Sequence, residues 1–193
     1  MIIAVPAETF AGERRVSLVP ETVQRLTAKQ LQVWLQSGAG AGARFSDDDY
    51  RRAGASVETS VHRLLGEADL IVKVRAPSVA EVERLRRGAT LICLLYPRIN
   101  TAATRSLAAR GVTTIALENL PRTSVAQTMD VLSSQSTAAG YRAVIVAANA
   151  LAKFFPMLMT PAGTIAPARV LVLGAGVAGL QAIATARRLG AAL

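Results

Sequence analysis

Short apolar runs alternate with segments of helical apolar spacing along the first 118 residues of the chain. Apolar runs of this length, bounded by turn residues, are typical of buried strands, and the segments between them are typical of helices. This alternation predicts an α/β fold with a mostly parallel sheet and right-handed crossovers. The predicted strands are Ile2–Val5, Gln32–Leu35, Leu70–Val74, Thr90–Leu95 and Val112–Leu117.

The predicted helices begin and end at residues with suitable capping chemistry. Pro20 suits the first position of a helix at Glu21–Lys29, and Ser46 precedes three acids that favour a helix N-terminus. Ser78 and Glu81 have capping-box spacing. A further helix is predicted at Ser60–Glu67, and the helix that begins after Ser78 should end at Arg87, before Gly88. Asn100 would cap a helix at Thr101–Arg110, and Gly111 would end that helix.

The segment Glu118–Ala152 contains one glycine, Gly140, and no proline after Pro121. We expect a long helix here, from about Ser124 or Val125 to Lys153. Its first half is polar and its second half almost wholly apolar, so one end should be buried and the other should face a cleft or solvent. A proline-punctuated connector should follow at Phe155–Pro167.

A compact aliphatic run, Arg169–Leu173, is followed at once by Gly174, Gly176 and Gly179 in a G-x-G-x-x-G motif, and then by a helical pattern at Leu180–Leu189. This order of strand, glycine turn and helix is typical of a Rossmann dinucleotide-binding fold. Gly174 would allow a tight turn, Gly176 a close approach of the pyrophosphate, and Gly179 close packing of the helix. The helix N-terminus would offer free N–H groups to the phosphates.

The acidic residue that binds the adenine ribose should lie about 20 residues beyond this motif, whereas the sequence stops at Leu193. We therefore expect an incomplete second lobe and no residue here that separates NAD from NADP. The predicted division is a first α/β lobe at residues 1–125, a connecting helix and linker at 126–167, and the start of a Rossmann lobe at 168–193.

The formal net charge of +9 raises the possibility of nucleic-acid binding. The basic residues, however, occur as scattered doublets without interleaved aromatic residues, which argues against a nucleic-acid surface. Cys93, the only cysteine, lies in an apolar run and indicates a small buried residue. The longest apolar stretch, from Ala143 to Ala152, is too short to span a bilayer.

Several segments together resemble the alpha subunit of proton-translocating NAD(P) transhydrogenase. The most specific segment is Pro121–Gln135, with its Arg-x-Ser-x-Ala-Gln-x-x-Asp pattern; Phe155–Thr160 with Gly163-Thr164, and Val170–Ala186, resemble the same subunit. Glu13–Val16 and Gly38–Gly40 are similar both to this subunit and to alanine dehydrogenase. The resemblance extends over essentially the whole chain.

This resemblance implies an NAD(H)-binding component that exchanges hydride with NADP(H) held on another component, coupled to proton translocation. It implies partners that bind NADP(H) and span the membrane, a homodimer, and a peripheral place on the cytoplasmic side of the inner membrane. Arg122, Gln127, Asp130 and Ser133 would contact the nicotinamide end, and no catalytic side chain or metal is required because the cofactor carries the hydride chemistry. The predicted cofactor-binding residues are Arg122, Thr123, Ser124, Val125, Gln127, Asp130, Ser133, Gly174, Gly176, Val177, Ala178 and Gly179.

The spacing of Gln127, Asp130 and Ser134 would also place these side chains on one face of the predicted helix. Carboxamide, carboxylate and hydroxyl groups can satisfy the donors and the acceptor of a nicotinamide carboxamide. The same polar residues would equally suit a solvated helix start with an N-cap.

Two alternatives stay open. Alanine dehydrogenase is favoured by Arg15 and Lys73, which stand where that family places its carboxylate-binding residues, but its acid–base histidine is replaced by Tyr96. The only histidine, His62, lies in a predicted helix and indicates a surface position. The second alternative is an inactive truncated remnant of an NAD-binding protein, for which we expect no fluorescence change with NADH and no preference for NADH over NADPH.

Overall fold

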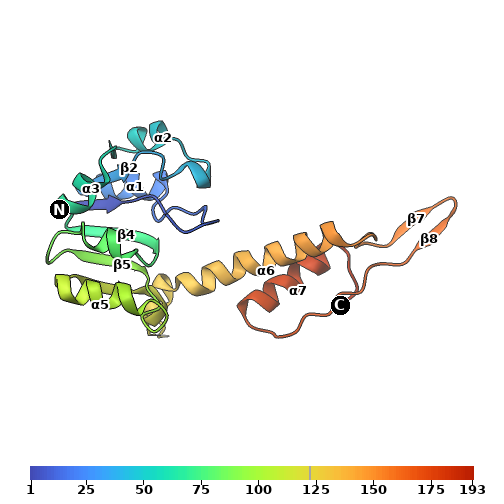
Figure 1. Cartoon of the computed structure of the whole chain (residues 1–193). Coiled ribbons are helices and arrows are strands. Elements are labelled where there is room, and N and C mark those ends of the chain that lie inside the picture. Colours follow the sequence, from blue (N-terminus) through green and yellow to red (C-terminus); the bar gives the residue numbers. More distant parts are fainter. Residues whose placement is uncertain (122) are drawn as a thin grey trace. The chain divides into compact units, whose positions relative to one another are not determined.

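In the computed structural model, which describes residues 1–121 and 123–193, the chain divides into two compact units. Unit 1 comprises Met1–Leu120 and unit 2 comprises Pro121–Leu193. The α/β fold class predicted from the sequence is confirmed (Figure 1). The three-part division at residues 125 and 167 stays a prediction.

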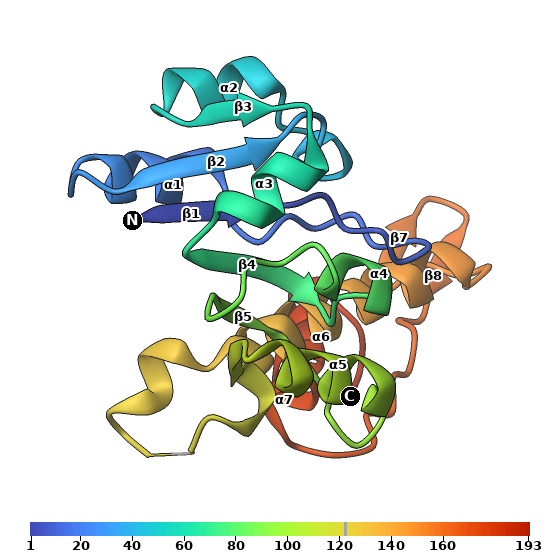
Figure 2. The same cartoon turned by 60° about the vertical axis from the view of Figure 1, so that its left-hand side comes forward.

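Unit 1 is built on one parallel sheet with the strand order β3-β2-β1-β4-β5-β6. Figure 2 shows the strands from β3 to β5 in this order. This order reverses direction between β1 and β4, as in doubly wound nucleotide-binding folds. The strands are β1 (Ile2–Val5), β2 (Gln32–Gln36), β3 (Ser56–Glu58), β4 (Leu70–Arg75), β5 (Thr90–Leu94) and β6 (Thr113–Ala116).

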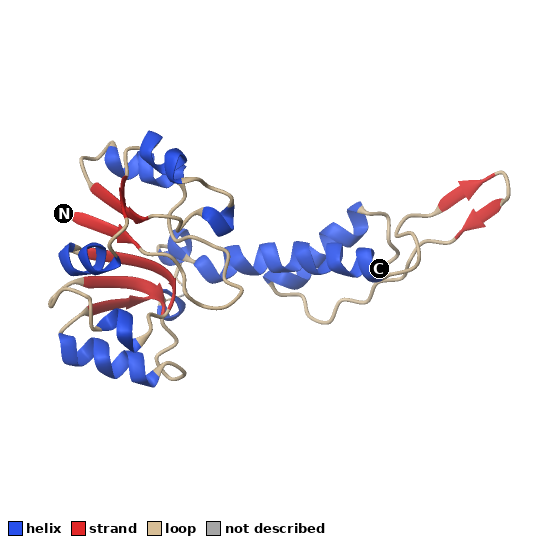
Figure 3. Cartoon of the chain, turned by 45° about the horizontal axis from the view of Figure 1, so that its top comes forward, coloured by secondary structure: helices blue, strands red, loops and turns tan. Residues whose placement is uncertain are grey.

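Helices cover both faces of this sheet, because successive side chains of a strand point to opposite faces (Figure 3). In β1, Ala4 joins a core with Leu64 and Leu107, whereas Ile3 and Val5 join a second core with Tyr50. The helical elements are α1 (Pro20–Thr27), η1 (Ala41–Ala43), α2 (Asp47–Arg52), α3 (Val61–Glu67), α4 (Val79–Val82), α5 (Thr101–Arg110) and η2 (Leu117–Asn119).

The capping boxes predicted from the sequence are formed at Ser46 and at Ser78. The predicted helix end at Arg87 is wrong, because α4 ends at Val82. Beyond it the N–H of Leu85 bonds to the carbonyl of Val82, three residues back, and the N–H of Arg86 donates to Leu65 in α3. Gly88 has a φ of +74°, a conformation that favours glycine, but it lies in the turn after these bonds.

The predicted Asn100 cap is also wrong. The Asn100 side chain donates to the carbonyl of Leu95 instead of accepting from the first turn of α5. The helix nevertheless has its predicted bounds, and Gly111 ends it in the left-handed region with a φ of +71°. The short edge strand β3 was not predicted, since three residues give too little alternation to detect.

Unit 2 consists of η3 (Ala126–Met129), the long helix α6 (Val131–Ala150), the hairpin of β7 (Leu158–Thr160) and β8 (Gly163–Ile165), and α7 (Val177–Arg188). Helices α6 and α7 lie side by side, and the hairpin projects from the rest of the unit (Figure 3). The hydrophobic core of unit 2 contains Val144, Phe155, Ala168 and Ala186.

Three sequence predictions for unit 2 need correction. The long helix starts at Val131, after Asp130, and ends at Ala150. The predicted connector contains the antiparallel hairpin β7–β8, in which Met159 pairs with Thr164. The predicted strand Arg169–Leu173 is not formed, because within the described residues this run pairs through a single bridge, Arg169 to Ala192, and a strand requires a continuous partner.

Candidate functional site

The glycine motif of unit 2 forms a tight turn that opens α7. Gly174 has a φ of +103°, a backbone conformation that residues with a side chain rarely adopt. Gly176 is the N-cap residue of α7, in an extended conformation and with no side chain to cap the helix. The first N–H groups of a helix have no partner within it, so this turn presents donors and the positive end of the helix dipole.

The turn is closely packed at Gly179 and open at Gly176. A Cβ atom at Gly179 would lie 2.0 Å from the carbonyl oxygen of Gly174, so only glycine lets the first turn of α7 close on the loop. At Gly176, by contrast, no heavy atom of the described chain lies within 4 Å of the corresponding Cβ position, apart from those of Gly176 and its two chain neighbours. The tight turn predicted at Gly174 is formed, whereas binding of a pyrophosphate by this turn stays a prediction.

The second predicted set of site residues lies just before and in the first turn of α6. Arg122 lies outside the described residues. Thr123 and Ser124 lie in a turn, where the Thr123 carbonyl accepts from the N–H groups of Ala126 and Gln127. Val125 is 84% exposed. This segment therefore presents exposed side chains next to Asp130.

Asp130 is the N-cap of α6. Its Oδ1 accepts a 3.0 Å hydrogen bond from the Ser133 N–H, and its Oδ2 accepts a 2.6 Å bond from the Ser133 hydroxyl. The prediction that Gln127, Asp130 and Ser134 share a face of one α-helix is wrong, because Gln127 lies in the 3-10 helix η3 and Asp130 has a non-helical ψ of 84°. The structure does bring Asp130 and Ser133 into direct contact.

Gly140 contacts the glycine motif, although sequence reasoning did not place it at the site. A Cβ atom at this buried position would lie 2.1 Å from the carbonyl oxygen of Ala178, in the first turn of α7. The signal available in the sequence was a single glycine in the interior of a long helix, where glycine is unfavourable unless a close contact requires it.

In unit 1, an acidic and basic cluster lies at the carboxyl ends of β1 and β4. Glu13 accepts hydrogen bonds from the Arg15 side chain, the shorter at 2.6 Å, and from Arg75 Nε at 2.9 Å. Hydrogen bonding from the Arg15 side chain is the main reason that the pKa of Glu13 falls to about 2. Burial raises the pKa of the nearby Glu8, although the Lys73 charge opposes this rise.

The residues that favoured alanine dehydrogenase are already paired within unit 1. Lys73 is 3% exposed, and its ammonium group pairs with the Glu81 carboxylate. Arg15 pairs with Glu13. Tyr96 has an unusual positive φ of 45° and its N–H donates to Glu118, whereas His62 is exposed on α3, as expected from the sequence.

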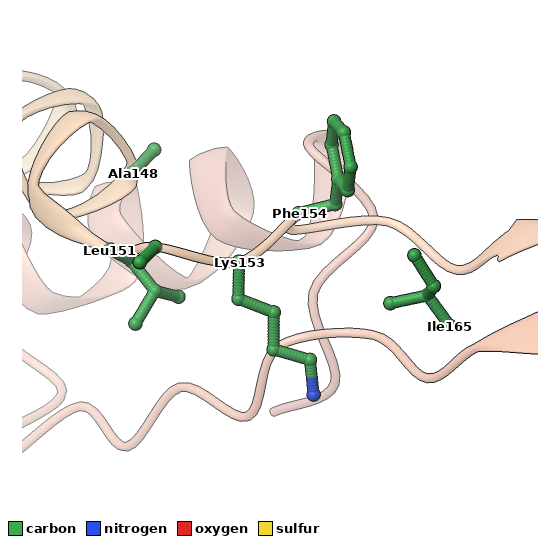
Figure 4. Close-up of a pocket in the computed structure, with 6 residues that line it drawn as sticks. Ala148, Leu151, Lys153, Phe154 and Ile165 are labelled. Atoms are coloured by element: carbon green, nitrogen blue, oxygen red, sulfur yellow. The ribbon is translucent and has the colours of Figure 1, made fainter.

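A separate open hollow of about 450 Å³ lies in unit 2 where α6 ends (Figure 4). The residues of the predicted cofactor site that the structure describes are not among those that line it, so this hollow is not the predicted site. The hollow is mostly apolar, and its lining residues are Ala148, Leu151, Ala152, Lys153, Phe154 and Ile165.

Over the ranges 1–121 and 123–193, the side chains form no cluster of three or more histidine, cysteine, aspartate or glutamate residues able to hold a metal. No helix within those same ranges combines the length and the apolar character needed to cross a bilayer.

Comparison with known proteins assigns both portions of the chain. Residues 4–139 match the N-terminal domain of alanine dehydrogenase/PNT, and residues 143–193 match the C-terminal domain. The chain is 48% identical, over 99% of its length, to an NAD(P) transhydrogenase alpha subunit protein of Rhodospirillum rubrum, and 39% identical over the same share to an alanine dehydrogenase of Halomonas elongata.

A crystal structure of a transhydrogenase from Sinorhizobium meliloti is also similar, with a TM-score of 0.95, 46% identity and coverage of 99% of this chain. The chain spans 57% of that structure and about half the length of the curated relatives, 51% for the Rhodospirillum rubrum protein and 52% for the Halomonas elongata protein. The match to residues 4–139 alone covers more than half of the sequence. On these grounds, the chain belongs to the alanine dehydrogenase/PNT family.

Proposed function

We propose that this chain is the NAD(H)-binding component of a nicotinamide nucleotide transhydrogenase, in which hydride passes between NAD(H) and NADP(H) and is coupled to proton translocation. The observation that carries the proposal is the Gly174–Gly179 turn, which leaves the N-terminus of α7 without a side-chain cap and with open space at Gly176. The names of the transhydrogenase relatives support the same interpretation.

In this proposal the chain binds and orients the dinucleotide, and the cofactor itself supplies the hydride. The N–H groups of Val177, Ala178 and Gly179 would donate to the pyrophosphate. Asp130 would accept from the nicotinamide carboxamide while it caps α6, since an ionised carboxylate offers about four acceptor positions. The residues Arg122, Thr123, Ser124, Val125, Gln127 and Ser133 would surround the nicotinamide end of the cofactor.

The proposal includes the partners and place implied by the resemblance. The NADP(H)-binding and membrane components would be separate partners, and this component would be peripheral, on the cytoplasmic side of the inner membrane, and homodimeric. The alternative of an alanine dehydrogenase-like enzyme is supported by the Halomonas elongata relative. Formation of NADH from NAD and alanine by this chain would favour that alternative.

The assignment of the nicotinamide end is tested with Asp130→Ala. Removal of an N-cap side chain costs about 1 kcal/mol of stability, so a matched control is needed. Ser60 caps α3 in unit 1 through a hydrogen bond from the Arg63 N–H, and Ser60→Ala removes a comparable cap far along the chain. NADH affinity, measured by nicotinamide fluorescence, should fall roughly tenfold in Asp130→Ala, equivalent to the loss of one good hydrogen bond, and should not change in Ser60→Ala.

Folding of both variants is checked by circular dichroism. A folded Asp130→Ala variant with the affinity of the unchanged chain would remove the nicotinamide assignment. Failure of the unchanged chain itself to bind NADH would instead favour the inactive remnant.

A further inference from the structure

The packing of α6 on α7 includes one very close backbone contact. Gly140 lies in the middle of α6, and a Cβ atom there would approach the Ala178 carbonyl oxygen to 2.1 Å, its carbon to 2.9 Å and its Cα to 3.1 Å. All three are backbone atoms, so a rotamer change cannot relieve the overlap. Any side chain at position 140 would therefore move one helix away from the other.

The same face of α6 joins this contact to the first turn of the helix. Ser133, Ser136, Gly140 and Val144 follow at intervals of three or four residues, so they lie along one face. Gly140 and Val144 are buried, whereas Ser133 and Ser136 are half-buried beyond the contact. Ser133 and Gly140 are seven residues apart in the helix, about 10 Å along its axis.

Ala178, on the other side of the contact, belongs to the glycine motif itself. It lies between Gly176 and Gly179 in the first turn of α7. A rigid helix thus runs from Asp130 and Ser133 to the turn proposed to bind the pyrophosphate. A shift of α6 at Gly140 would change the separation between these two groups of residues without altering either group.

We propose that Gly140 is a positioning residue for the dinucleotide, which fixes the separation of the Asp130–Ser133 end of α6 from the Gly174–Gly179 turn. The inference rests on the proposed NAD(H) binding and adds to it a residue that does not touch the cofactor. Glycine is unfavourable in a helix interior relative to alanine, and the close approach of α6 to Ala178 is the physical reason for a glycine at this position.

The test compares two ligands and four variants of the full chain. NADH needs both ends of the site, whereas ADP carries the diphosphate without the nicotinamide. Gly140→Ala should weaken NADH binding by roughly tenfold and leave ADP binding unchanged. Gly66→Ala is the matched control, because Gly66 is also helical and the nearest atom to its added Cβ outside its own helix, the Arg84 carbonyl oxygen, lies 3.8 Å away.

Val144→Ala controls for lost stability, since it leaves a cavity in the same interface without forcing the helices apart. It should lower the melting temperature and keep the ratio of NADH to ADP affinity. Should Gly140→Ala not fold, Val144→Leu takes its place, because one added methylene group presses on the same interface. That variant should lower the ratio in the same direction, by less.

The ratio of NADH to ADP affinity distinguishes the possible outcomes. A lowered ratio of NADH to ADP affinity in Gly140→Ala, together with an unchanged ratio in Gly66→Ala and Val144→Ala, supports the positioning role. An unchanged ratio, or an equal loss for both ligands, overturns that role and leaves NAD(H) binding intact; for a chain that needs the second variant, an unchanged ratio in Val144→Leu does the same. If the unchanged chain binds neither ligand, the proposed function fails and the inference fails with it.

Discussion

In the loop after β1, the Glu13 carboxylate accepts hydrogen bonds from Arg15 and Arg75, and the Glu13 side chain is 5% exposed. The Arg75 guanidinium also lies 4.8 Å from the centre of the Phe10 ring, over its face. These contacts hold the loop after β1 against the end of β4. The ionised form of Glu13 is therefore favoured in the folded state, which explains its lowered pKa.

The lowered pKa of Glu13 predicts how the stability of the chain depends on pH in the acidic range. Because the pKa of Glu13 is about 2 in the folded state against an ordinary value of 4.5, its stabilisation is complete above pH 4.5 and is lost as the pH falls towards 2. Glu13→Gln should show a smaller loss of unfolding free energy over this range. Urea unfolding followed by Trp34, the only tryptophan and a residue of unit 1, measures it.

Glu21→Gln is the control for this titration, since the Glu21–Arg25 pair lies on the exposed surface of α1. Its acid dependence should equal that of the unchanged chain. Identical slopes for Glu13→Gln and the unchanged chain between pH 4.5 and 2 would contradict the role given to Glu13.

Between elements, the buried Lys73–Glu81 pair joins β4 to α4. Glu81 also accepts from the N–H and hydroxyl of Ser78 in the capping box, so one carboxylate serves both the helix start and the strand. The burial of Lys73 agrees with a structural role in this unit.

Lys73→Met should lower the unfolding free energy by about 3 kcal/mol, because it leaves a buried carboxylate without its cation. Chemical denaturation measures the change, and Lys29→Met on the exposed surface should cost little. The double variant Lys73→Met with Glu81→Gln should regain most of the unfolding free energy lost in Lys73→Met, since glutamine keeps the capping box without the charge. A single Lys73→Met variant as stable as the unchanged chain would show that the pair does not hold α4 on β4.

Elements with local signals were those that the sequence predicted well. The capping boxes at Ser46 and Ser78 and the end of α5 at Gly111 depend on neighbouring residues alone. The start of α6 was missed because Asp130 suits equally a helical position and a cap. The strand predicted at Arg169–Leu173 was wrong because pairing depends on a partner segment, which no local pattern reports.

For the whole molecule, the sequence predicted an α/β fold and the family, while contacts between distant segments needed the structure. The glycine motif could be interpreted residue by residue, because each glycine has a local geometric reason. The contact of Gly140 with Ala178 joins residues far apart in the chain and could not be found in that way. The choice of NAD(H) rests on resemblance and stays a proposal.

Both proposals depend on the binding of NAD(H) by this chain. The most direct measurement is a titration of the purified chain with NADH, followed by nicotinamide fluorescence. The proposal predicts a saturable change with NADH. The absence of a saturable change would contradict it.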